Sequence, residues 1–79
     1  MENNLSLVKE KFKELPNNIE AEQAVIGSIL VTNEIFDEIN TIINSSNFYD
    51  PMHQRIFEAI ENLIYKGMLA NPITLKNYF

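Results

Sequence analysis

The stretch that most constrains the fold runs from Ala24 to Val31 and carries no charged side chain. On a helix its apolar residues point in several directions, which is typical of a helix buried on all sides. Asn18 can cap this helix through its side-chain oxygen, so the helix is predicted over 18–31. At about 14 residues it is too short to span a bilayer. We therefore expect a small helical domain built around a buried first helix.

Two further expectations concern this helix. Gly27 and Ser28 lower its helix propensity, which we interpret as a place where another backbone approaches closely. Glu20 and Glu22 lie in its first turns, where the positive end of the helix dipole favours carboxylates. Because residues two apart on a helix point to different sides, we expect two solvent-exposed carboxylates rather than a catalytic pair.

Length and composition limit the class of protein. The chain has 79 residues, 46% of them hydrophobic, which suits one folded domain with a modest core. It contains no cysteine, so it has neither a disulfide framework nor a thiolate metal site. Neither a signal peptide nor a transmembrane segment is apparent, and we expect a cytoplasmic protein that does not bind membranes.

The net charge of −5 is unevenly distributed. Lysines and glutamates balance in the first fifteen residues, so the excess lies in the rest of the chain. An acidic body repels phosphate, which disfavours direct binding of nucleic acid, whereas a basic protein partner remains possible. The charged residues of that body are Glu20, Glu22, Glu34, Asp37, Glu38, Asp50, Glu58 and Glu61, with Arg55, Lys66 and Lys76.

The chain divides into an N-terminal arm over 1–15 and a helical head over 16–79. The arm has a weak helical pattern and is predicted to be flexible, with a transient helix as the alternative. Besides the first helix, the head is predicted to contain helices at 34–44, 50–66 and 72–79. The last begins at an Asn-Pro cap, has no C-terminal cap and looks truncated.

The helix over 34–44 is predicted from an apolar stripe, with Thr32 and Asn33 supplying its cap. The stripe consists of Ile35, Phe36, Ile39, Ile42 and Ile43. A polar loop over 44–47 follows, and then Phe48 and Tyr49, one of which is expected to bury its ring against the start of the next helix.

The helix over 50–66 has the strongest signals. Asp50 is its N-cap, Pro51 its first residue and Gly67 its left-handed stop. Tyr65 falls on its outer face and is our candidate partner contact. Its apolar arc is predicted to bury Met52, Ile56, Phe57, Ile60, Leu63 and Ile64.

Catalytic and metal sites find little support. Two glycines cannot build a P-loop, and no nucleophile elbow is present. Asp50 and His53 have the spacing of half a di-iron motif, but the chain has a single histidine. We interpret His53 as a core or capping residue bonded to nearby backbone, with a pH-sensitive contact as the alternative. A helix-turn-helix DNA reader would need a basic recognition helix, which this chain lacks.

Two stretches resemble the N-terminal domain of the bacterial replicative DNA helicases, the DnaB family. The first is Ile19-Glu20-Ala21-Glu22-Gln23-Ala24-Val25-Ile26-Gly27-Ser28-Ile29-Leu30, which is similar to the opening helix of that family. The second is Phe48-Tyr49-Asp50-Pro51-Met52-His53-Gln54-Arg55-Ile56-Phe57, with Gly67 behind it. Their order and spacing fit, and together they cover about residues 15–79.

The resemblance implies an all-α, small orthogonal helical bundle that carries no catalytic residue. In the family this domain joins the collar of a hexameric ring and helps to dock primase or the helicase loader. ATP and Mg²⁺ belong to a later motor domain, so this chain is expected to hold no cofactor. The resemblance carries over as core, caps and turns only, at Ile19, Ala24, Ile26, Gly27, Leu30, Phe48, Asp50, Pro51, His53, Ile56, Phe57 and Gly67.

A second interpretation stays open. The chain could be a free-standing helical adaptor or oligomerisation protein with no role in unwinding. An open reading frame that continues beyond Phe79 into a Walker A motif would favour the helicase, and a stop codon there would favour the adaptor.

Overall fold

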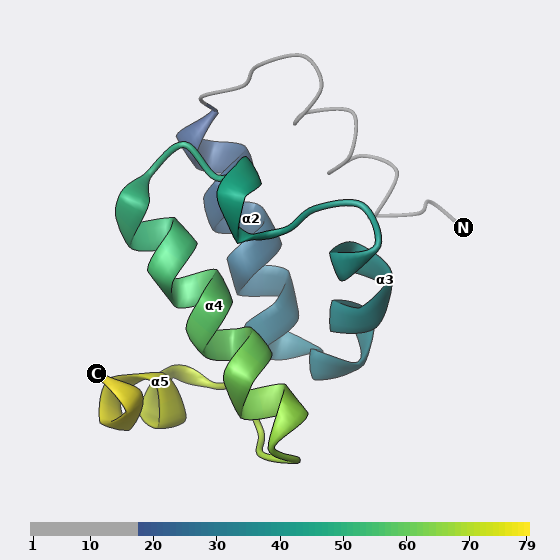
Figure 1. Cartoon of the computed structure of the whole chain (residues 1–79), viewed down its shortest axis with the longest axis vertical. Coiled ribbons are helices and arrows are strands. Elements are labelled where there is room, and N and C mark those ends of the chain that lie inside the picture. The colour runs from purple at the N-terminus through teal and green to yellow at the C-terminus, as the bar shows by residue number, and fades with distance from the viewer. Residues whose placement is uncertain (1–17) are drawn as a thin grey trace.

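The computed structural model describes residues 18–79, and within this range the chain is helical and contains no strand (Figure 1). The predicted all-α fold is confirmed, while the predicted arm over 1–15 lies outside the described residues. The elements are α2 (Ile19–Val31), η1 (Asn33–Ile35), α3 (Phe36–Asn40), η2 (Ser45–Asn47), α4 (Pro51–Tyr65) and α5 (Pro72–Tyr78). Within residues 18–79, no helix has the length and hydropathy that crossing a bilayer requires.

The helix α2 begins as its sequence indicates, because the Asn18 side chain accepts a hydrogen bond from the Ala21 N–H at 3.0 Å. Its burial is one-sided, however, and the expectation of a helix buried all round is wrong. Val25 and Ile29 face the core, whereas Ala24 is exposed and Val31 is 87% exposed. Apolar residues are common on protein surfaces, so the absence of charge between Ala24 and Val31 did not show that every side of the helix is buried.

Gly27 also differs from expectation. It lies on the exposed side of α2, and a Cβ built at this position would meet no atom within 4 Å. No backbone elsewhere in residues 18–79 approaches it, so the predicted close approach is wrong for this part of the chain.

The second predicted helix is shorter than expected. The α-helix α3 ends at Asn40, and the chain continues in a tight turn in which the Thr41 hydroxyl donates to the Glu38 carbonyl at 2.6 Å. This side-chain bond competes with the helical ladder, and the β-branched residues that follow have low helix propensity. Ile42 is consequently exposed, although the stripe placed it inside.

The helix α4 matches its local signals. The Asp50 side chain accepts from the Met52 N–H at 2.8 Å, Pro51 is the first helical residue, and Gly67 follows with a φ of 78°. Met52 is the exception, because it is 55% exposed and not part of the core.

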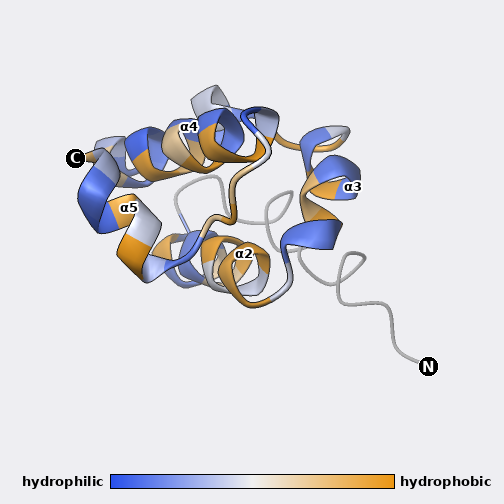
Figure 2. Ribbon diagram, turned by 90° about the horizontal axis from the view of Figure 1, so that it is seen from below, coloured by the Kyte–Doolittle hydropathy of each residue, from blue (hydrophilic) through white to orange (hydrophobic). Residues whose placement is uncertain are grey.

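The core lies between α2, α3 and α4, whose hydrophobic sides face inward (Figure 2). Phe57 is at its centre, with ring centroids 5.0 Å from Phe48 and 5.4 Å from Phe36. Three buried aromatic rings supply much of the apolar area that a domain of this size can bury. The buried cluster consists of Val25, Ile26, Ile29, Phe36, Ile39, Ile43, Phe48, Phe57, Ile60, Leu63 and Ala70.

The helix α5 packs on the outside of this core, next to α4, and contributes no buried residue. Asn71 caps it by accepting from the N–H groups of Ile73 and Thr74, as its sequence indicates. The preceding linker is anchored by Ala70, which is 1% exposed. Leu69 beside it is 69% exposed, so only part of the linker covers the core.

Candidate functional site

A buried hydrogen-bonded cluster joins the two stretches that the sequence singles out. The side chain of Glu22, a residue only 1% exposed, accepts from the Tyr49 N–H at 2.6 Å and the Asp50 N–H at 3.3 Å. The same carboxylate lies 2.8 Å from Nδ1 of His53. Because an ionised carboxylate can only accept hydrogen bonds, the imidazole donates to it through Nδ1.

This cluster corrects the prediction for Glu22, which was expected in solvent. A buried carboxylate is costly unless its oxygens are hydrogen-bonded, and here α4 and the residues before it supply the donors. His53 is buried as predicted, but its partner is a carboxylate on α2 rather than nearby backbone. The cluster therefore fixes the start of α4 against α2 and has no free oxygen aimed at a ligand.

The other residues predicted from the resemblance are divided between core and surface. Ile26, Phe48 and Phe57 are buried, and Leu30, Asp50 and Ile56 are partly buried. Pro51 and Gly67 are exposed, as their positions at the ends of α4 allow. Ile19 and Ala24 are exposed as well, so their assignment to the core is wrong.

Tyr65 is 72% exposed at the end of α4. One turn earlier on the same side, the Asn62 amide donates to the Tyr78 hydroxyl at 2.8 Å. Tyr65 is thus accessible, and its role as a partner contact stays a prediction. Within residues 18–79 no group of three or more acidic or histidine side chains could hold a metal ion.

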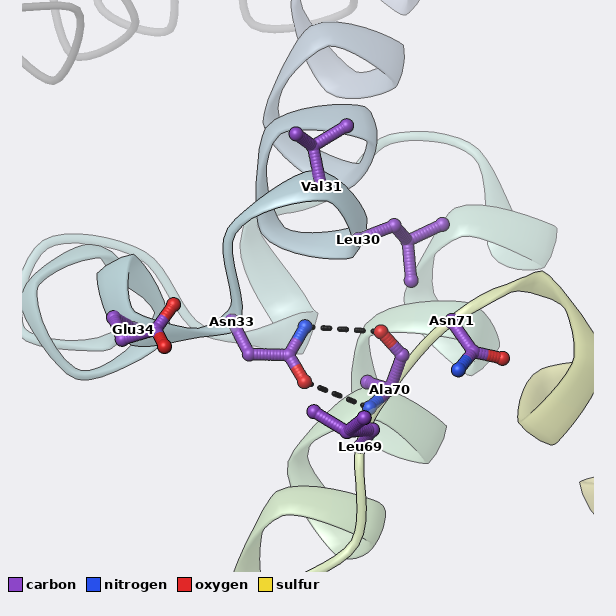
Figure 3. Close-up of a pocket in the computed structure, with 7 residues that line it drawn as sticks. All are labelled: Leu30, Val31, Asn33, Glu34, Leu69, Ala70 and Asn71. Carbon is purple, nitrogen blue, oxygen red and sulfur yellow. Dashed lines mark hydrogen bonds between the residues drawn. The ribbon is translucent and has the colours of Figure 1, made fainter.

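A pocket opens at the opposite end of α2 from the Glu22 cluster. It has a volume of about 280 Å³ and lies between the end of α2, η1 and the linker that precedes α5 (Figure 3). This junction pocket is lined by Leu30, Val31, Asn33, Glu34, Leu69, Ala70 and Asn71.

The Asn33 side chain holds the two walls of the junction pocket together. Its Nδ2 donates to the Ile29 carbonyl at 2.7 Å. The same Nδ2 donates to the Ala70 carbonyl at 2.9 Å, and Oδ1 accepts from the Ala70 N–H at 2.8 Å (Figure 3). In this arrangement, the Asn33 clamp, both ends of the side-chain amide bond to the backbone of one buried residue, Ala70. Asn33 was expected to cap the next helix, and that expectation is wrong, because no side chain caps η1.

Sequence reasoning missed the junction pocket because its walls come from two segments that are far apart in the sequence, and neither segment alone predicts a pocket. Val31 was interpreted as core, and Leu69 as linker laid over the core. The one available signal was the absence of a basic residue in the last turn of α2, where the helix dipole favours one.

Comparison with known proteins identifies the family of this fold. The family model described as "DnaB-like helicase N terminal domain" matches residues 14–79. The chain belongs to the DnaB-like helicase N-terminal domain family. The match covers both stretches joined by the Glu22 cluster, as well as the junction pocket.

The curated relatives of this DnaB-like domain are named as replicative DNA helicases. The chain is 43% identical over 63 residues to the replicative DNA helicase DnaB of Rickettsia typhi, covering 80% of this chain and 13% of the relative. It is 40% identical over 72 residues to the helicase of the same name from Buchnera aphidicola, covering 91% of this chain and 16% of the relative. The DnaB-like chain thus spans only a small part of these relatives. No solved structure matches it.

Proposed function

We propose that this chain is the non-catalytic N-terminal interaction domain of a replicative DNA helicase, which serves in ring assembly and in docking primase or a helicase loader in the cytoplasm. The observation that carries the proposal is the match to the helicase N-terminal family over residues 14–79. On this proposal, ATP and Mg²⁺ act in another part of the parent helicase.

The surface chemistry supports contact with proteins rather than with DNA. Acidic residues outnumber basic ones in the described part of the chain, and phosphate would be repelled from such a surface. Within residues 18–79 the buried polar side-chain atoms all have hydrogen-bond partners, so none is left aimed at a substrate. Exposed apolar and aromatic side chains remain for contacts with other proteins.

Isothermal titration calorimetry with the C-terminal domain of the primase from the same organism tests the docking role. We expect saturable binding at equimolar stoichiometry. Light scattering over a range of chain concentrations tests self-association, for which we expect a mass that rises with concentration. Absence of both primase binding and self-association would favour the free-standing adaptor.

A further inference from the structure

Apolar side chains lie exposed at the walls of the junction pocket. Val31 is 87% exposed and Leu69 is 69% exposed, and the partly buried side chain of Leu30 lies between them (Figure 3). Apolar groups gathered around a concave surface indicate an interaction site more strongly than scattered ones do.

The charge at the rim of the pocket is negative and unpaired. Glu34 lines the pocket, and its carboxylate forms no hydrogen bond or ion pair with any other residue of 18–79. The helix α2 ends at the same place with no basic residue in its last turn, so its C-terminal carbonyls add partial negative charge. An apolar surface bordered by negative charge suits a long cationic side chain, whose alkyl stem is apolar and whose head is charged.

The pocket is also formed before any partner arrives. The Asn33 clamp holds the linker against the end of α2, and the Thr74 hydroxyl donates to the Leu69 carbonyl at 2.8 Å. A partner therefore does not have to order this surface, which lowers the entropic cost of binding.

We propose that the junction pocket docks a basic amphipathic segment of another protein, which places Lys or Arg against Glu34 and aliphatic side chains over Val31 and Leu69. This inference rests on the proposed function as an interaction domain, and it adds the surface and the chemistry of the partner. The charges decide between the possible occupants. A second copy would bring another acidic surface, and in residues 1–15 of this chain the glutamates cancel the lysines.

The probe is a synthetic helical peptide of about 15 residues, with leucines on one face and lysines at its borders. Two matched peptides replace the lysines by glutamates or the leucines by serines. We titrate each into the isotopically labelled full chain and follow backbone amide shifts by NMR. The Lys–Leu peptide is expected to shift the amides of Val31, Glu34, Leu69 and Ala70, and both matched peptides are expected to bind at least tenfold more weakly.

Variants then locate the binding. Leu69→Ser is expected to weaken the Lys–Leu peptide about tenfold, and Glu34→Gln about threefold. The matched controls are Tyr49→Ser and Glu38→Gln, which alter an exposed ring or an exposed carboxylate elsewhere and should leave affinity within twofold. Since Leu69 and Glu34 are exposed, these variants should keep the native spectrum outside the pocket.

The inference is overturned by shifts centred away from the pocket, or by equal loss of affinity in the control and pocket variants. Neither result would touch the proposed function, because primase binding is measured separately. If primase binds the chain and Leu69→Ser leaves that affinity unchanged, the docking role stands and the assignment of this pocket falls.

Discussion

At the scale of single residues, two side chains connect parts of the chain that local patterns treat as separate. Glu22 forms hydrogen bonds with two backbone N–H groups and a histidine that lie 27 to 31 residues away in the sequence. Asn33 forms two hydrogen bonds with the backbone N–H and carbonyl of Ala70, 37 residues away. Each replaces water as the partner of buried polar groups, so removing either leaves those groups unpaired.

The first prediction concerns Glu22. Glu22→Gln keeps the shape of the side chain but turns an NH₂ group toward donors, and it should lower the free energy of unfolding by about 2–3 kcal/mol. Urea denaturation followed by circular dichroism measures the change. Glu20→Gln on the same turn is the control, since Glu20 is exposed, and it should cost about 0.5 kcal/mol. Equal losses in the two variants would show that the buried cluster contributes no special stability.

The second prediction concerns Asn33. Asn33→Ala removes three hydrogen bonds to backbone groups and should lower the free energy of unfolding by about 2 kcal/mol. It should also increase hydrogen exchange of the Ala70 amide by at least tenfold, measured by NMR. Asn77→Ala, at an exposed position of α5, is the control. An unchanged Ala70 exchange rate would mean that the clamp does not hold the linker.

At the scale of elements, helix ends were predictable and helix faces were less so. Caps are local, so Asn18, Asp50 and Asn71 could be assigned from sequence, and each accepts the expected backbone bond. Burial is not local. The stripe of α4 contrasts with a polar face and was predicted well apart from Met52, whereas α2 has apolar residues on both sides and only its neighbours decide which side is covered.

The candidate site was predicted less completely for the same reason. The signature residues were found because they form continuous stretches. The partners of Glu22 and Asn33, and the meeting of Val31 with Leu69 in one pocket, depend on how the helices pack. One sequence without an aligned set gives no direct signal for such distant pairs.

The two glycines give a third prediction, in which the same substitution has opposite effects. Gly27→Ala, in an exposed helix interior with free space for a Cβ, should raise the free energy of unfolding by about 1 kcal/mol. Gly67→Ala, at a φ of 78°, should lower it by about 1 kcal/mol. Thermal denaturation of both variants and of Gly67→Asn, which tolerates the left-handed region better, checks the pair. If Gly27→Ala instead destabilised the chain, another backbone would have to lie close to Gly27, contrary to the structure.

At the scale of the whole molecule, an apolar core lies beneath a surface on which acidic residues outnumber basic ones within residues 18–79. The Glu22 cluster closes one end of α2, and the junction pocket opens at the other. Within residues 18–79, the junction-pocket end combines the exposed side chains of Val31 and Leu69 with the unpaired carboxylate of Glu34. The two ends of α2 therefore differ: the Glu22 cluster stabilises the fold at one end, and the junction pocket is the candidate contact surface at the other.

The fourth prediction concerns Val31, at the junction-pocket end of α2. Val31→Lys places a cation at the C-terminal end of α2 and should raise the melting temperature by about 3 °C, because Val31 is nearly fully exposed and loses little packing. It should also weaken the Lys–Leu peptide, by repulsion. Val31→Glu is the matched control and should lower the melting temperature by a similar amount. High salt should shrink both shifts, and shifts of equal sign would contradict the dipole argument.

The helix α5, which buries none of its residues, has a consequence for how the molecule comes apart. Its capping bonds and the Asn62–Tyr78 contact are near water, so this segment can detach while the aromatic interior stays intact. We therefore expect α5 to open at a lower free energy than the core does. Leu69 lies in the linker that leads into α5, so a ligand bound against it should make α5 detach less readily. Filling the junction pocket would then reduce the motion of the whole α5 segment.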